Sequence, residues 1–148
     1  MTKSLPPKSL VLYADDDRDD IELIREAFSE FAYTVELLTF EDSRKLISYL
    51  EHLPPLQPTP CLIILDINMP LINGKETLSK IRQMQGFEKI PVVLFSTSTL
   101  PSEALFAKSL DAGFVTKPLH AEQIHQILHQ LIEHCSDEVQ TRIRQQRG

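Results

Sequence analysis

The chain has 148 residues and a formal net charge of −6, with 42% hydrophobic and 24% charged residues. This length suits one domain, and the composition is typical of a globular protein with a hydrophobic core. The acidic balance argues against nucleic acid as a general partner, because binding to phosphates needs clustered basic side chains. Its apolar runs are too short for a membrane span, and residues 1–10 lack the apolar stretch of a signal peptide, so we expect a cytoplasmic protein without a membrane partner.

Short apolar runs alternate with longer segments of helical periodicity along the chain. Strands are predicted at residues 10–14, 34–40, 61–65, 91–95 and 114–116, and helices at 17–32, 43–53, 75–84, 102–110 and 121–135. Apolar residues three or four positions apart, such as Ile21, Ile24 and Phe28, indicate the helices. The run at 61–65 is continuously apolar, which is typical of a parallel strand buried on both faces. This order predicts an α/β fold in which five parallel strands form one doubly wound sheet.

Two stretches lie outside this repeating pattern. Residues 53–60 carry four prolines and are predicted to form a stiff extended loop. Residues 136–148 follow the expected domain, which spans 8–135, and are polar apart from Val139 and Ile143. We expect this segment to be a short extra helix or a frayed tail, because it is too short to form an output domain.

Polar side chains stand directly after four of the expected strands. Asp15 and Asp16 follow the first strand, Asp66 the third, Ser96 the fourth and Lys117 the fifth. Because the carboxyl ends of parallel strands face one crevice, where ligands bind in such sheets, we expect these side chains to converge. The start of a solvated helix would by itself explain the crowded aspartates of residues 15–20, since acids favour the positive end of the helix dipole.

The converging carboxylates predict a magnesium site. Asp15, Asp16 and Asp66 would repel one another unless a cation lay among them, and hard oxygen ligands suit Mg²⁺. Asn68 is placed to add its backbone carbonyl, whereas Lys117 supplies only one positive charge. One carboxylate is then free to attack phosphorus, while the metal and the lysine neutralise the phosphoryl oxygens.

The residues of this site resemble those of response regulator receiver domains in two-component signalling, over residues 8–135. The matching motifs are Leu12-Tyr13-Ala14-Asp15-Asp16-Asp17, Leu65-Asp66-Ile67-Asn68-Met69-Pro70, Asn73-Gly74, Ser96 and Lys117-Pro118. The set is specific because all of its members occur in the family's order and spacing. The resemblance implies a five-stranded flavodoxin-like sheet and a phosphoacceptor function.

The resemblance also implies a role for each site residue. Asp66 becomes the aspartyl phosphate, and Asp16 binds Mg²⁺ directly while Asp15 binds it mainly through water. Ser96 and Lys117 hold the phosphoryl oxygens. The domain would assist its own phosphorylation and dephosphorylation but would not be an enzyme that turns over an external small molecule.

A conformational switch and several departures from the family follow from the same comparison. Phosphorylation would draw Ser96 toward the phosphate and allow Phe114, which stands where many receivers have tyrosine, to swing inward. Leu110 and Asp111 replace the usual Gly-Ala pair, which leaves the shape of the loop before the fifth strand open. The bond between Lys117 and Pro118 is cis in the family.

The implied partners are proteins. A sensor histidine kinase or a histidine phosphotransfer protein would donate the phosphoryl group, and an unidentified downstream protein would receive the signal. The segment 23–28, the Asp66 motif and the proline-rich insert are most similar to single-domain regulators that include partners of phytochrome-type kinases. We also expect a homodimer, because Val139 and Ile143 extend the apolar stripe of the last predicted helix.

Two alternative functions remain open at this point. Haloacid-dehalogenase-like phosphatases also use an aspartyl phosphate, but Asp19 stands where they need Thr or Val, and no acidic pair follows Lys117. The second alternative is a receiver-like module that binds proteins without being phosphorylated. His125 and His129 have the spacing of a zinc-binding pair, but without an evident third ligand we interpret them as surface residues.

Overall fold

The computed structural model describes residues 8–54 and 59–145. Its five strands are β1 (Ser9–Ala14), β2 (Val35–Phe40), β3 (Leu62–Asp66), β4 (Val92–Ser96) and β5 (Gly113–Thr116). They form one sheet in the order β2-β1-β3-β4-β5, and all neighbours pair in parallel. The predicted doubly wound, flavodoxin-like sheet is therefore confirmed. The strand order reverses between β1 and β3, and in sheets of this kind ligands bind at the carboxyl ends of the strands at such a reversal.

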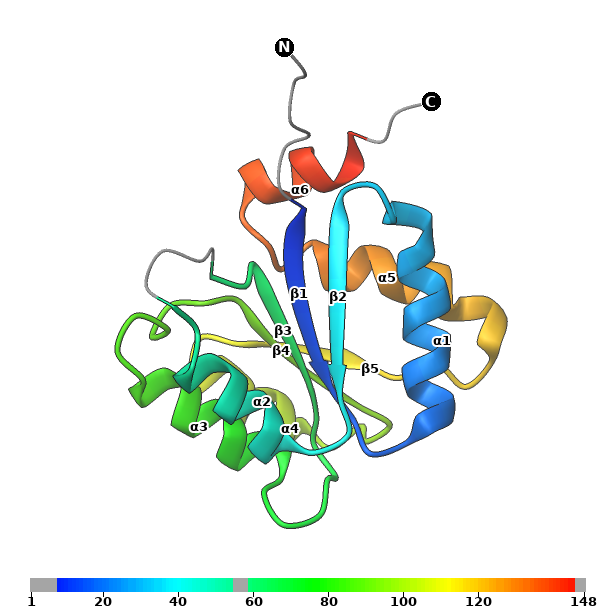
Figure 1. The fold of residues 1–148 in the computed structure, drawn as a ribbon. Helices are drawn as coiled ribbons and strands as arrows, with labels where there is room; N and C mark the ends of the chain where they lie inside the picture. Colours follow the sequence, from blue (N-terminus) through cyan, green and yellow to red (C-terminus); the bar gives the residue numbers. More distant parts are fainter. Residues whose placement is uncertain (1–7, 55–58, 146–148) are drawn as a thin grey trace.

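Two layers of helices cover the sheet (Figure 1). Helices α1 (Arg18–Phe28) and α5 (Ile124–Ile132) lie on one face, and α2 (Ser43–Glu51), α3 (Gly74–Gln83) and α4 (Pro101–Ser109) lie on the other. Short 3₁₀ turns, η1 (Ser29–Phe31) and η2 (Ala121–Gln123), follow α1 and precede α5. Alternate residues of β1 serve the two layers, since Val11 and Tyr13 pack toward α1 and α5 while Leu12 packs toward α2 and α3.

Local sequence fixes where the helices that flank the site begin. The side chain of Asp17 caps α1 by accepting hydrogen bonds from the amides of Asp19 and Asp20. Asn73 and Glu76 form a capping box that starts α3. The next residue after Asn73, Gly74, lies against the end of β3, where an added Cβ would come within 2.4 Å of the carbonyl oxygen of Asp66. Only glycine fits this close approach of two backbones.

The segment after α5 forms a sixth helix, α6 (Asp137–Arg144), beside the amino end of β1 (Figure 1). Ile143 is fully buried in the core shared with α1 and α5, and Val139 packs against the same core. Thr34 Oγ1 also donates a hydrogen bond to the carbonyl of Ile143 at 2.7 Å. Of the two forms expected for this segment, the structure has the short helix over Asp137–Arg144. The apolar stripe on which the expected homodimer rested packs against the chain's own core.

The loop before β5, whose shape the sequence left open, forms a turn that is held by α3. Asp111, just after α4, adopts a left-handed conformation with φ of 55°, which aspartate tolerates better than most residues. Arg82 secures this turn by donating hydrogen bonds to the carbonyls of Leu110 and Asp111, at 2.8 and 3.0 Å. The expectation of a cis peptide bond between Lys117 and Pro118 is wrong, since the described residues contain no cis peptide bond. Part of the predicted proline-rich loop, residues 55–58, lies outside the described residues.

Candidate functional site

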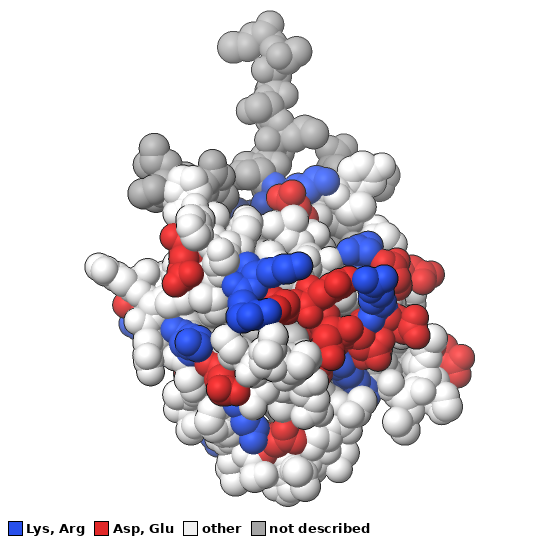
Figure 2. All heavy atoms as spheres, turned by 60° about the horizontal axis from the view of Figure 1, so that its bottom comes forward, with Lys and Arg blue, Asp and Glu red and all other residues white. Residues whose placement is uncertain are grey.

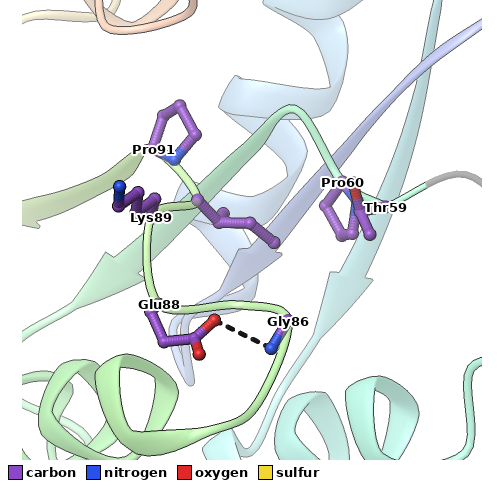
Figure 3. Close-up of a pocket in the computed structure, with 7 residues that line it drawn as sticks. Thr59, Pro60, Gly86, Glu88, Lys89 and Pro91 are labelled. Atoms are coloured by element: carbon purple, nitrogen blue, oxygen red, sulfur yellow. Dashed lines mark hydrogen bonds between the residues drawn. The ribbon is translucent and has the colours of Figure 1, made fainter.

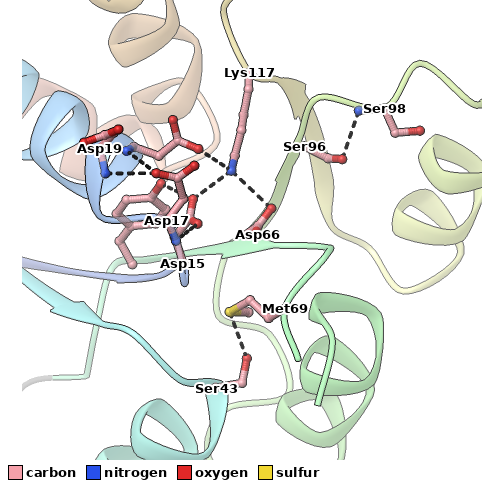
Figure 4. A network of polar contacts seen from close by, with 11 residues as sticks. Asp15, Asp17, Asp19, Ser43, Asp66, Met69, Ser96, Ser98 and Lys117 are labelled. Carbon is pink, nitrogen blue, oxygen red and sulfur yellow. Dashed lines mark hydrogen bonds and ion pairs between the residues drawn. The ribbon is translucent and has the colours of Figure 1, made fainter. Parts of the chain in front are cut away.

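Acidic side chains and one lysine meet where the first, third and fifth strands end (Figure 4). Asp15, Asp16 and Asp66 each offer a carboxylate oxygen, and these oxygens all lie within 4.8 Å of one another. Asp15 and Asp66 are buried, whereas Asp16 is exposed. Figure 2 turns the lower end of Figure 1 forward and shows acidic side chains gathered on this face. The predicted convergence of these carboxylates is therefore present in the structure.

Lys117 crosses this group from the end of β5. Its Nζ lies 2.8 Å from Asp15 Oδ2, 2.8 Å from Asp20 Oδ2 and 3.2 Å from Asp66 Oδ1. Burial lowers the pKa of Lys117, but hydrogen bonds to Asp15 and Asp20 outweigh burial and leave the pKa raised. Lys117 therefore stays charged. Asp20 was not among the predicted site residues, because its position in the acidic run was explained by the start of a helix.

The pKa of Asp66 is raised as well, but in a carboxyl group a raised pKa disfavours the charged form. Burial and the negative charge of Asp15 raise the pKa of Asp66 to about 6, although Lys117 opposes the shift. One ammonium group therefore does not compensate the carboxylates around it. Three closely spaced carboxylate oxygens with excess negative charge fit a hard divalent cation such as Mg²⁺.

A buried tyrosine supports the acidic group from within the sheet. The Tyr13 hydroxyl donates a hydrogen bond to Asp15 Oδ2 at 2.5 Å, and burial and the charge of Asp15 raise the pKa of Tyr13. The backbone amide of Asp17 donates to the other oxygen, Asp15 Oδ1, at 2.9 Å. Both oxygens of Asp15 thus already accept hydrogen bonds from the protein. Tyr13 lies in the predicted first strand, but nothing in the sequence indicated this contact.

The structure places three further predicted residues on β4, on β5 and in the loop after β3. Ser96 ends β4, next to Phe95, which pairs with Asp66 across the sheet. The Ser96 side chain is buried, and its Oγ accepts a hydrogen bond from the amide of Ser98 at 3.0 Å. Phe114 is partly buried and packs against the core on the α4 side of the sheet. Asn68 lies in the loop after β3 with its side chain exposed, so its role as a carbonyl ligand stays a prediction.

The sequence profile of the response regulator receiver domain family matches residues 11–129. The chain belongs to this family. As a receiver, it is a phosphoacceptor response regulator of a two-component system, and neither the phosphatase nor the unphosphorylated binding module is favoured. In the described residues, no helix is long and apolar enough to span a membrane.

Relatives of this receiver include phytochrome response regulators. The response regulator Rcp1 of Synechocystis is 27% identical over 129 residues, which cover 85% of this chain and 87% of Rcp1. The phosphorylated cyanobacterial phytochrome response regulator RcpA has a similar structure, with a TM-score of 0.78, 27% identity, and coverage of 89% of this chain and 96% of RcpA. The Mn²⁺-bound form of Rcp1 gives a TM-score of 0.73 at 26% identity, covering 83% and 91% of the two chains.

Other candidate sites in the receiver have fewer residues suited to metal binding or phosphoryl transfer. His125 Nδ1 and His129 Nε2, on α5, lie 3.3 and 3.6 Å from the carboxylate oxygens of Glu30 in η1, and all three side chains are partly exposed. Among residues 8–54 and 59–145, only the three aspartates bring three potential ligand atoms together, which supports the interpretation of the histidines as surface residues.

A hollow of about 710 Å³ lies at the opposite end of the sheet (Figure 3), where Pro60 and Pro91 precede β3 and β4. Within its lining, the amide of Gly86 donates a hydrogen bond to Glu88 at 2.8 Å. The acidic group, not this hollow, contains the residues suited to phosphoryl chemistry.

Proposed function

We propose that Asp66 accepts a phosphoryl group from a sensor histidine kinase or a histidine phosphotransfer protein. The observation that carries this assignment is the position of Asp66 at the end of β3, with its Oδ1 3.2 Å from Lys117 Nζ and its carboxylate beside Asp15 and Asp16. A carboxylate oxygen of Asp66 attacks phosphorus, and the bond from phosphorus to the histidine nitrogen of the donor breaks, with its electron pair left on that nitrogen. Lys117 balances charge on the transferred group.

The acidic group would hold Mg²⁺, which neutralises phosphoryl oxygens when bound. In this proposal Asp16 and Asp66 are direct ligands, and the backbone carbonyl of Asn68 completes the protein's share. Asp15 acts mainly through water, a role supported by the donors from Tyr13 and Asp17 that already engage both of its oxygens. The Mn²⁺-bound structure of the relative Rcp1 supports a divalent cation in this fold.

Phosphorylation would be signalled to a downstream protein through a change in the conformation of the receiver's surface. The Ser96 hydroxyl donates a hydrogen bond to a phosphoryl oxygen, and the Phe114 side chain moves into the space that Ser96 vacates. Two observations support this proposal. Ser96 is buried next to Phe95, which pairs with Asp66 in the sheet, and Phe114 is only partly buried. The surface altered in this way is built from α4, β5 and α5, and a downstream protein would bind there.

The proposed kinase is of the phytochrome type. RcpA is a phytochrome response regulator, and its similarity to this receiver over most of both chains supports the assignment. We keep a cytoplasmic location and the absence of enzymatic turnover of external small molecules as parts of the proposal. A homodimer also stays a proposal, without support from the α6 stripe.

Intact-mass measurement tests the assignment. Protein incubated with acetyl phosphate and Mg²⁺ should gain one phosphoryl group, whereas Asp66→Asn should gain none. A chelator should abolish the gain in the parent protein. Equal labelling of Asp66→Asn would show that another residue is the acceptor, and labelling that resists the chelator would remove the metal from the proposal.

A further inference from the structure

The ammonium group of Lys117 is engaged by three carboxylates. It has three N–H donors, and Nζ donates hydrogen bonds to Asp15 and Asp20 at 2.8 Å each and forms an ion pair with Asp66 at 3.2 Å. A phosphoryl group on Asp66 would bring new anionic oxygens to this lysine. Lys117 would then have to weaken one of its present contacts.

The three contacts are not equally easy to break. The side chain of Asp15 is fully buried and is also held by Tyr13 and the amide of Asp17, while Asp66 carries the phosphoryl group itself. The side chain of Asp20 is 29% exposed, so its carboxylate can turn toward water at lower cost. Asp20 is therefore the contact that phosphorylation would displace.

Asp20 is not required to start the helix on which it lies. The side chain of Asp17 caps α1 and accepts a hydrogen bond from the amide of Asp20 itself. The Asp20 carboxylate instead reaches Lys117, which is 97 positions away along the chain. The contact thus joins the first turn of α1 to the lysine of the phosphorylation site.

We propose that Asp20 is a positioning residue that competes with the phosphoryl group of Asp66 for Lys117. The inference rests on the proposed function of Asp66. In the unphosphorylated protein Asp20 holds Lys117 toward α1 and partly neutralises it. Phosphorylation releases Asp20 from Lys117. Because this contact must be lost, the affinity of the site for a phosphoryl group is lower. The first turn of α1, which carries Asp20, therefore responds to phosphorylation.

The affinity for beryllofluoride, a mimic of the acyl phosphate, measures this competition directly. Titration in the presence of Mg²⁺, followed by NMR, should give about three- to tenfold tighter binding for Asp20→Asn than for the parent. Asp19→Asn is the matched control, because it removes the same charge from the same helical turn but Asp19 is exposed and its carboxylate has no contact with Lys117. We expect its affinity to stay within about twofold of the parent.

A double-mutant cycle separates positioning from a general effect of charge. In a Lys117→Ala background, Asp20→Asn should no longer tighten binding, because the residue for which Asp20 competes is gone. Persistence of the full effect without Lys117, an equal effect of Asp19→Asn, or weaker binding by Asp20→Asn would each overturn the inference. Asp20→Ala, which should change affinity in the same direction, serves if Asp20→Asn does not fold.

Failure of this inference can be distinguished from failure of the proposed function. If the parent protein is labelled on Asp66 but Asp20→Asn behaves as Asp19→Asn does, only the role of Asp20 is wrong. If the parent protein neither binds beryllofluoride nor accepts a phosphoryl group, the proposed function is wrong and the competition proposed here is wrong with it.

Discussion

At the scale of single residues, the fold holds several negatively charged side chains closer together than they would lie in the unfolded chain. Asp66 shows the consequence, since burial and the charge of Asp15 raise its pKa to about 6. In the unfolded chain the same carboxyl would titrate near its ordinary value of about 3.9. Between these two values the folded protein binds more protons than the unfolded chain. This residue therefore lowers the stability of the metal-free protein as the pH rises from about 4 to about 6.

Asp66→Asn should remove that pH dependence. We expect the metal-free variant to be more stable than the parent above pH 6, by roughly 2–3 kcal/mol given the size of the pKa shift, and to show little gain near pH 4. Urea unfolding of both proteins in the presence of a chelator, at several values between pH 4 and pH 8, measures the difference. The same gain at every pH would show that the pKa of Asp66 does not differ between the folded and the unfolded protein.

The residues missed by the sequence analysis show what a pattern of residues omits. The ends of the strands revealed Asp15, Asp66 and Lys117, because a parallel sheet brings those ends to one edge whatever the side chains do. Asp20 and Tyr13 belong to the site only through the directions of their side chains, toward Lys117 and Asp15. Such contacts depend on packing between distant segments, which neither periodicity nor spacing records.

At the scale of elements, the same limit applies to α6. The sequence left residues 136–148 open as a short helix or a frayed tail, and the structure has a helix with Val139 and Ile143 on its apolar face. Periodicity identifies a face but not what covers it, and here the cover is the chain's own core near β1 and α5. The loop before β5 was also open from sequence, because Arg82, which holds it, comes from α3.

Truncating the buried side chain of α6 tests this packing. Ile143 is fully buried, so Ile143→Ala should lower the free energy of unfolding by about 2–4 kcal/mol through lost burial and the cavity that remains. Leu105→Ala is the control, since Leu105 on α4 is 66% exposed and should change stability by less than about 0.5 kcal/mol. Chemical unfolding measures both. Equal, small effects would mean that α6 detaches from the core in solution.

At the scale of the whole molecule, the fold gathers acidic side chains although the chain already carries a net charge of −6. The carboxylates of Asp15, Asp16 and Asp66 lie at the carboxyl ends of β1 and β3, where the strand order reverses, and a backbone held in this way cannot separate them. Their repulsion opposes folding in the absence of a cation, and one lysine relieves only part of it. A bound divalent cation should therefore stabilise the entire domain, because it binds the assembled group and not the unfolded chain.

Thermal unfolding with and without Mg²⁺ tests this coupling. A hundredfold excess of Mg²⁺ over its dissociation constant should stabilise the parent by about 2.7 kcal/mol and raise the Tm accordingly. Asp16→Ala should lose most of this response and be at least as stable as the parent without metal, because one repelling carboxylate is gone. Asp137→Ala, at the start of α6 near the other end of the sheet, should keep the full response. An Asp16→Ala protein that is less stable yet responds fully to Mg²⁺ would mean that this aspartate serves the start of α1 and does not bind the metal.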